Sequence, residues 1–290
     1  MFWSKPVELK TTEQLKQMRR AGLVVAGALA ATSAAVRVGV TTRELDAVAA
    51  DVISSAGAQS SFQDYGAVNG VGGFRGVTCI SVNEEIVHGV PGERTLAAGD
   101  LVSIDCGAIV DGWHGDSAVS VFVGEAAEHA LALSDATRTA MWHGIAAARL
   151  NGFVSDISAA VADYVAGLEP AYGIVEEYVG HGIGSAMHQP PDVPNVRPRG
   201  LRAPSRGVKI APGLALAIEP MLTLGPPDNH VLDDDWTVVT DSGALACHWS
   251  PTRARWWLGC SGARRPRVAP TTRRTPSGCA SSCTTSRRRR

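Results

Sequence analysis

The sequence has few cysteines and lacks a long uninterrupted hydrophobic run. Its six cysteines include no Cys-x-x-Cys pair among 290 residues, and a disulfide framework is not expected in a domain of this size. The Ala/Val-rich stretch 21–36 is shorter than the roughly 20 residues of a membrane span, so we expect the buried end of a helix there. Charged residues recur as far as Arg20, which excludes a signal peptide. These absences favour a reduced, cytoplasmic protein without a membrane anchor.

Acidic residues are absent from residue 250 onward. Residues 250–290 contain 11 Arg and no Asp or Glu, whereas residues 1–249 contain all 28 acidic residues and 16 of the 27 basic ones. One folding unit rarely separates its charges in this way. We therefore interpret 250–290 as an Arg/Ser/Pro-rich tail that is disordered or translated out of frame. The alternative is a basic tail that binds nucleic acid, whereas the body is not expected to do so.

Residues 1–249 show helix and strand patterns that occur twice in the same order. Capping-box spacing at Thr11 and at Thr41 predicts the starts of two helices, and Ser155 is a candidate cap for a later one. The other predicted elements are strands at 77–82, 101–110 and 117–123, a helix within 125–149, and strands at 174–179, 214–219 and 236–240. The order predicts an α+β fold with duplicated halves, 1–124 and 125–249, that form one domain.

Two carboxylates lie near a strong hairpin signal. Asp111-Gly112 is a typical two-residue hairpin turn, and counting back from it places Asp116 opposite Gly107. Asp105 is two residues from Gly107 on the same strand, and therefore on the same face. Neither carboxylate would be stable in a buried sheet without a cation or a hydrogen-bond partner. The alternative is that one or both point into solvent near the turn.

Two further candidates occur in the second half of the chain. His181 lies in Gly180-His-Gly-Ile-Gly184, where the glycines allow the backbone to approach a site closely. Glu219 ends an apolar run and is followed by Pro220, and a carboxylate at the end of a buried strand needs a partner. Taken alone, His181 is more often a core or surface residue, and Glu219 can be an exposed strand end.

Taken together, these segments resemble the type I methionine aminopeptidases over about residues 8–249. The segments that agree in order are Asn83–Pro91 with His88, the Asp105–Asp116 hairpin, Gly180–Gly184, Ala217–Met221 and Asp233–Thr237. The resemblance implies the pita-bread fold: a curved antiparallel sheet with helices on its outer face and a pseudo-twofold relation between the halves.

The resemblance also implies a centre of two divalent metal ions held by Asp105, Asp116, His181 and Glu219. Carboxylate and imidazole donors suit Mn, Fe, Co or Zn without selecting among them. Glu219 would also shuttle the proton. His188 would stabilise the tetrahedral oxyanion, and His88 would donate near the scissile amide.

Substrate-binding positions follow from the same resemblance. Cys79 and Trp236 correspond to pocket positions around the methionine side chain, with Tyr65 and Phe74 beside them, and His88 contacts the substrate as well. The implied substrates are the N-terminal peptides of nascent proteins, preferably with a small second residue. A monomer that can contact the ribosome is expected.

The fifth ligand of the family, a Glu on the last strand, is missing. The segment Cys247-His248-Trp249 reaches the right position, and Ser250 follows it. Loss of a bridging carboxylate predicts weak metal binding and low activity. Two alternatives remain open: a non-catalytic pita-bread protein that binds peptides, and a relative of the X-Pro peptidases.

Overall fold

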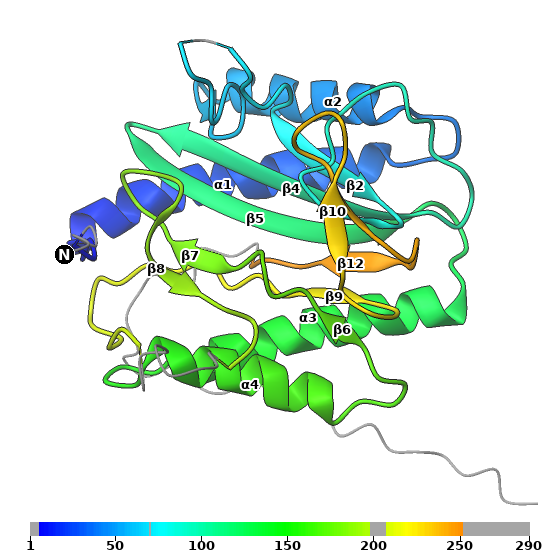
Figure 1. Cartoon of the computed structure of the whole chain (residues 1–290). Coiled ribbons are helices and arrows are strands. Elements are labelled where there is room, and N and C mark those ends of the chain that lie inside the picture. Colours follow the sequence, from blue (N-terminus) through cyan, green and yellow to red (C-terminus); the bar gives the residue numbers. More distant parts are fainter. Residues whose placement is uncertain (1–5, 70, 198–206, 252–290) are drawn as a thin grey trace, which may run out of the picture. The chain divides into compact units, whose positions relative to one another are not determined.

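The computed structural model describes residues 6–69, 71–197 and 207–251. The predicted tail beyond residue 251 therefore lies outside the described residues. Two pairs of helices and a set of antiparallel strands make up the described part (Figure 1), which confirms the expected α+β class. None of the described helices is both long enough and apolar enough to cross a membrane.

The first helix pair begins where the capping boxes predicted. The pair comprises α1 (Thr12–Ala35) and α2 (Thr42–Ser55). Thr11 and Thr41 accept a hydrogen bond from the N–H three residues on, and the side chain at that position accepts one in return. Each box satisfies two N–H groups that have no partner within the helix. Helix α1 packs against the sheet of the first half, and α2 packs beside α1.

The second helix pair corrects one prediction. Its members are α3 (Glu128–Ala147) and α4 (Val154–Ala166). Ser155 does not cap α4, because the helix has already begun at Val154. Phe153 is the N-cap, and the Asp156 carboxylate accepts its N–H at 2.9 Å.

The strands form short antiparallel sheets around one long hairpin. The first sheet has the order β1-β4-β2, with β5 on β4. It consists of β1 (Gln59–Ser60), β2 (Thr78–Val82), β4 (Leu101–Val110) and β5 (Trp113–Phe122). The others are β10-β11-β3, β12-β9-β6 and β7-β8. Their strands are β3 (Glu85–Val87), β6 (Gly173–Ile174), β7 (Gly180–Gly182), β8 (Gln189–Val193), β9 (Met221–Thr223), β10 (Asn229–Val231), β11 (Val238–Thr240) and β12 (Ala246–His248).

The β4–β5 hairpin has the register that the sequence predicted. Val110 pairs with Trp113, and Gly107 pairs with Asp116. The turn residues Asp111 and Gly112 have φ values of 51° and 77°, as a type I′ turn requires. Asp105 and Asp116 therefore lie on one face of the sheet, two residues out of register.

Two predicted strands are largely irregular. Of the stretch 174–179 only Ile174 is paired, as the last residue of β6, and 214–219 forms a single bridge, between Leu216 and Gly182. The 214–219 segment is extended and its Ala217 N–H donates to the His181 carbonyl at 2.7 Å. Its partner β7 is only three residues long and Pro220 has no N–H to donate, so a regular ladder cannot continue.

The halves meet where β12 lies along β5 (Figure 1). The Ser120 hydroxyl donates to the His248 carbonyl at 2.8 Å, and the Ser117 hydroxyl donates to the Ser250 carbonyl at 3.1 Å. The Ser250 N–H donates to the Ala118 carbonyl at 3.1 Å. These bonds fix the last described residues beside the strand that carries Asp116.

The turn of this hairpin gives a test of its role in the fold. Gly112→Ala should lower the free energy of unfolding by about 1 kcal/mol, because an L-residue is disfavoured at positive φ. A Cβ at Gly112 would meet no atom within 4 Å, so the cost is conformational. Gly92→Ala is the matched control, since φ of Gly92 is not positive and the nearest atom to its Cβ is at 3.9 Å. Urea unfolding of both variants measures the difference, and equal effects would contradict the account.

Candidate metal centre

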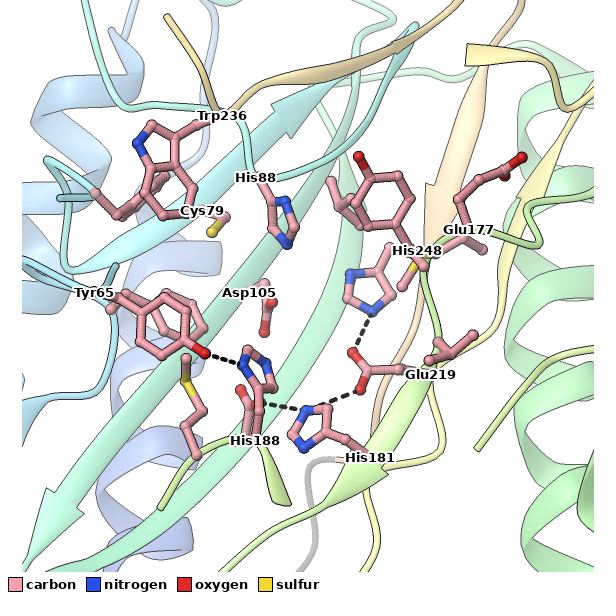
Figure 2. Close-up of a pocket in the computed structure, with 18 residues that line it drawn as sticks. Tyr65, Cys79, His88, Asp105, Glu177, His181, His188, Glu219, Trp236 and His248 are labelled. Atoms are coloured by element: carbon pink, nitrogen blue, oxygen red, sulfur yellow. Dashed lines mark hydrogen bonds and ion pairs between the residues drawn. The ribbon is translucent and has the colours of Figure 1, made fainter. Parts of the chain in front are cut away.

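A cavity of about 220 Å³ opens between the two halves (Figure 2). Residues from β2, β4 and β5 contribute one wall, and residues from β7, β12 and the segment before β9 contribute the other. All ten residues that the sequence analysis proposed line this cavity: Tyr65, Phe74, Cys79, His88, Asp105, Asp116, His181, His188, Glu219 and Trp236. The fold thus brings together residues separated by up to 171 positions, between Tyr65 and Trp236.

The four expected ligands surround one side of the cavity. His181 Nε2 lies 3.2 Å from Glu219 Oε1 and 3.5 Å from Asp116 Oδ2. The other ring nitrogen, Nδ1, lies 2.9 Å from the Gly182 carbonyl oxygen. Because a carbonyl only accepts, Nδ1 carries a hydrogen, and Nε2 faces the carboxylates. Asp105 lines the same cavity from β4.

The electrostatics of the carboxylates are those of an under-neutralised cluster. Burial, followed by the neighbouring Asp116 and Glu219, raises the pKa of Asp105 well above its usual range. Burial would also raise the pKa of Glu219, but His181 and His248 hold it below the usual value. Burial opposes charge on His181 as well, yet Glu219 and Asp116 raise its pKa well above the usual range. In this arrangement the imidazolium of His181 partly balances the charge that a metal cation would balance.

The residues fit a divalent metal ion in their chemistry. Asp116 Oδ1 and Glu219 Oε1 are buried without a hydrogen-bond partner, which is costly for carboxylate oxygens unless a cation is bound. As they stand, no three His, Cys, Asp or Glu side chains of the described residues are arranged so that they could hold an ion. In this arrangement the carboxylates of Asp116 and Glu219 contact the His181 ring.

Two further histidines lie at the open side of the cavity. Burial, and then the nearby His248, lower the pKa of His88 to about 4, so its ring is neutral at pH 7. His188 is exposed at the rim, and its Nδ1 lies 2.5 Å from the Tyr65 hydroxyl oxygen. If that hydroxyl donates, Nε2 of His188 carries the hydrogen and is available as a donor.

The remaining wall is apolar. Phe62, Phe74, Cys79 and Met187 are buried together, with Trp236 packed against them. Burial, and then Asp105, raise the pKa of the Cys79 thiol well above its usual range, so the thiol stays neutral. This wall suits an unbranched apolar side chain rather than a charged one.

The sequence analysis missed His248 as a site residue. His248 is 2% exposed, and its Nε2 lies 3.4 Å from Glu219 Oε2. Strand alternation was the available signal, because residues 248 and 250 share one face of a strand. Tyr178 and Glu177, which also line the cavity, follow an irregular segment that offered no such signal.

Ser250 lies beside the expected ligand set. It is 3% exposed, and its N–H donates to Ala118, the residue that pairs with Asp105. Residue 250 therefore follows β12 and its backbone lies beside the strand that carries Asp116, and it has a hydroxyl where the family resemblance implies a carboxylate.

The cost of enclosing Asp105 can be measured in the metal-free protein. With a chelator present, Asp105→Asn should raise the free energy of unfolding by about 1 kcal/mol, since it removes a carboxylate held beside two like charges. A raised pKa in the folded state means that this acid costs stability as pH rises above its ordinary value. The gain should therefore be larger at pH 8 than at pH 5. Asp51→Asn on the exposed face of α2 is the control. A loss of stability in D105N under chelation would contradict this electrostatic account.

Comparison with known proteins agrees with this geometry. Residues 16–255 match Metallopeptidase family M24. Methionine aminopeptidase 1 of Mycobacterium tuberculosis is 44% identical over 253 residues, 86% of this chain and 91% of that protein. Methionine aminopeptidase 1 of Bacillus subtilis is 40% identical over 245 residues, 84% of this chain and 94% of that protein.

A solved structure extends the agreement to the fold. The crystal structure of methionine aminopeptidase from Thermotoga maritima matches with a TM-score of 0.78 at 32% identity, over 84% of this chain and 94% of that one. The expected pita-bread fold is thereby confirmed. The chain belongs to metallopeptidase family M24 and, within it, to the methionine aminopeptidases.

Proposed function

We propose that this chain is a metal-dependent aminopeptidase that removes the N-terminal methionine from newly made proteins, preferably before a small second residue. The observation that supports this most is the cavity itself. It combines a carboxylate and imidazole cluster with an apolar wall, which suits hydrolysis next to an apolar N-terminal side chain. Residues 1–249 form the proposed catalytic domain, with halves 1–124 and 125–249.

The proposal extends to the setting of the enzyme. Its substrates would be the N-terminal peptides of nascent proteins in the cytoplasm, and it would act as a monomer that contacts the ribosome. Neither a nucleic acid nor a membrane is required for this activity.

Asp105, Asp116, His181 and Glu219 are the residues that would hold two divalent ions, Mn, Fe, Co or Zn. When bound, the ions supply an activated water and polarise the scissile carbonyl. The protein contributes the orientation of the donors: the Gly182 carbonyl fixes the His181 ring, and the hairpin register fixes the two aspartates.

The chain's own side chains would move the protons. By the family resemblance, Glu219, which lines the cavity, would accept a proton from the attacking water and return it to the leaving amine. His188, oriented by Tyr65, would donate to the carbonyl oxygen as negative charge develops there. His88, neutral and half-buried, would donate near the scissile amide.

The apolar wall would select methionine. Phe74 and Trp236 pack edge to face with ring centroids 5.4 Å apart, and the neutral Cys79 thiol lies among them. The thioether sulfur of a methionine side chain makes favourable contacts with the edges of aromatic rings. Tyr65 would complete this pocket at the rim.

The serine at position 250 would limit how tightly the centre binds two metal ions. Two divalent ions carry four positive charges, and the three carboxylates of the described ligand set supply three negative ones. Without a carboxylate at 250 the pair of ions is under-neutralised, and we expect weaker binding and slower turnover than a complete set would give.

A peptide panel tests the proposed reaction against its alternatives. With Co²⁺ or Mn²⁺ added, the full chain should release Met from a Met-Ala-Ser peptide at least about 100-fold faster than it releases Glu from Glu-Ala-Ser, because the apolar wall would desolvate the Glu carboxylate. Mass spectrometry of products at high enzyme concentration gives the rates. Preferential cleavage of X-Pro peptides would indicate the X-Pro alternative. Binding of Met-Ala-Ser without any cleavage would indicate a non-catalytic peptide-binding protein.

Restoring the carboxylate tests the role of residue 250. Ser250→Glu should tighten divalent metal binding by at least about tenfold, since a buried carboxylate beside the ligand set neutralises the ions. Ser250→Gln is the matched control, because it has the same size without the charge. Calorimetric metal titration compares the three proteins, and equal affinities of S250E and S250Q would refute the charge explanation.

A further inference from the structure

We propose that His248 is a metal ligand in this chain, and that its imidazole substitutes for the coordinating group that Ser250 lacks. The inference rests on the proposed metal centre and adds a residue to it. It rests on three observations of His248: its position beside Glu219, its burial, and its Nε2, which has no hydrogen-bond partner.

The position of His248 is that of a donor facing Glu219. Figure 2 shows Glu219 between the rings of His248 and His181. His248 Nε2 lies 3.4 Å from Glu219 Oε2, and His181 Nε2 lies 3.2 Å from Glu219 Oε1. Two donors bonded at about 2.0 Å to one tetrahedral ion lie about 3.3 Å apart. Each nitrogen thus lies at this spacing from one oxygen of Glu219, His181 from Oε1 and His248 from Oε2, so the Glu219 carboxylate joins the two imidazoles.

His248 Nε2 is buried beside Glu219 but makes no hydrogen bond. The residue is 2% exposed, and Nε2 has no hydrogen-bond partner. A buried nitrogen without a partner is costly, and native structures rarely keep one without a reason. Coordination of an ion would satisfy it.

The backbone holds this ring in place. The His248 N–H donates to the Ser103 hydroxyl at 3.2 Å, and its carbonyl accepts from Ser120 at 2.8 Å. These contacts anchor β12 to both strands of the long hairpin. The neighbouring residues Cys247 and Trp249 pack on the opposite side, against the helices, so the alternation of the strand directs His248 toward the cavity.

As a ligand in place of the missing carboxylate, His248 supplies a donor atom but no negative charge. A neutral imidazole restores a coordination position, whereas a carboxylate would also cancel one positive charge. With three carboxylates and two imidazoles, a single ion is fully neutralised and a second is not. We therefore expect one ion bound tightly by Glu219, His181 and His248, and a second bound weakly. Nitrogen-rich coordination favours Zn and Co over Mn.

X-ray absorption of the bound ion tests this directly. The chelator-treated full chain, loaded with one equivalent of Zn²⁺, should show scattering from two imidazoles. His248→Gln should reduce the count to one and raise the Zn²⁺ dissociation constant at least about tenfold. His248→Ala repeats the test without an amide, and His230→Gln is the control, since that imidazole is exposed and bonds Asp241 at 2.6 Å.

The outcomes separate the inference from the function on which it rests. One imidazole in the unmodified chain, with equal Zn²⁺ affinity in H248Q and H230Q, would overturn the role of His248 alone. This count needs no variant, so it stands even if a substitution at 248 prevents folding. Failure of the unmodified chain to bind Zn²⁺, Co²⁺ or Mn²⁺ would overturn the metal centre and the proposed function together. If His248 compensates for the missing carboxylate at 250, His248→Gln should lower Zn²⁺ affinity less in the S250E background than in the unmodified chain. An equal loss of affinity in both backgrounds would overturn the compensation.

Discussion

The enclosed carboxylates, which repel one another, are the constraint that the rest of this structure has to accommodate. The side chains of Asp116 and Glu219 are 8% and 9% exposed, and Asp105 faces the same cavity. Among their neighbours in the described part of the centre are the His181 ring, whose pKa they raise, and the His248 ring, which lies beside Glu219. Such a cluster lowers the stability of the metal-free fold. It persists because the strands that hold it are fixed by packing elsewhere, a common trade of stability for function.

Both halves of the chain contribute to this cluster, and neither contains it alone. The long hairpin supplies the two aspartates, and the second half supplies Glu219 and the histidines. Serines on the hairpin join it to β12 through buried hydrogen bonds. An ion bound between the halves would reinforce the same contact, so metal binding and the docking of the halves should stabilise each other.

Sequence reasoning found the parts of this arrangement that depend on local rules. The Asp111-Gly112 turn fixed the register of the hairpin and hence the face shared by Asp105 and Asp116, because a two-residue turn leaves only one pairing. The caps at Thr11 and Thr41 were equally local. The joint roles of Glu219, His181 and the aromatic wall required the family resemblance, since no local pattern connects residues so far apart in the sequence.

Other features were not predictable in this way. The segment 214–219 looks like a strand by composition, but it lacks a partner long enough for a ladder. His248 was not predicted, because the direction in which its side chain points depends on how β12 docks on β5. Helix α4 was predicted, but its cap was not: Phe153 rather than Ser155 is the N-cap, and Asp156 accepts the Phe153 N–H.

The central claim is that the cavity is a metal centre, and anomalous diffraction tests it most directly. Crystals of the full chain grown with Co²⁺ should show an anomalous peak at the cobalt edge between Asp116, His181 and Glu219, with His248 in contact. Absence of a peak in the cavity at saturating Co²⁺, with Met still released from Met-Ala-Ser, would contradict the account.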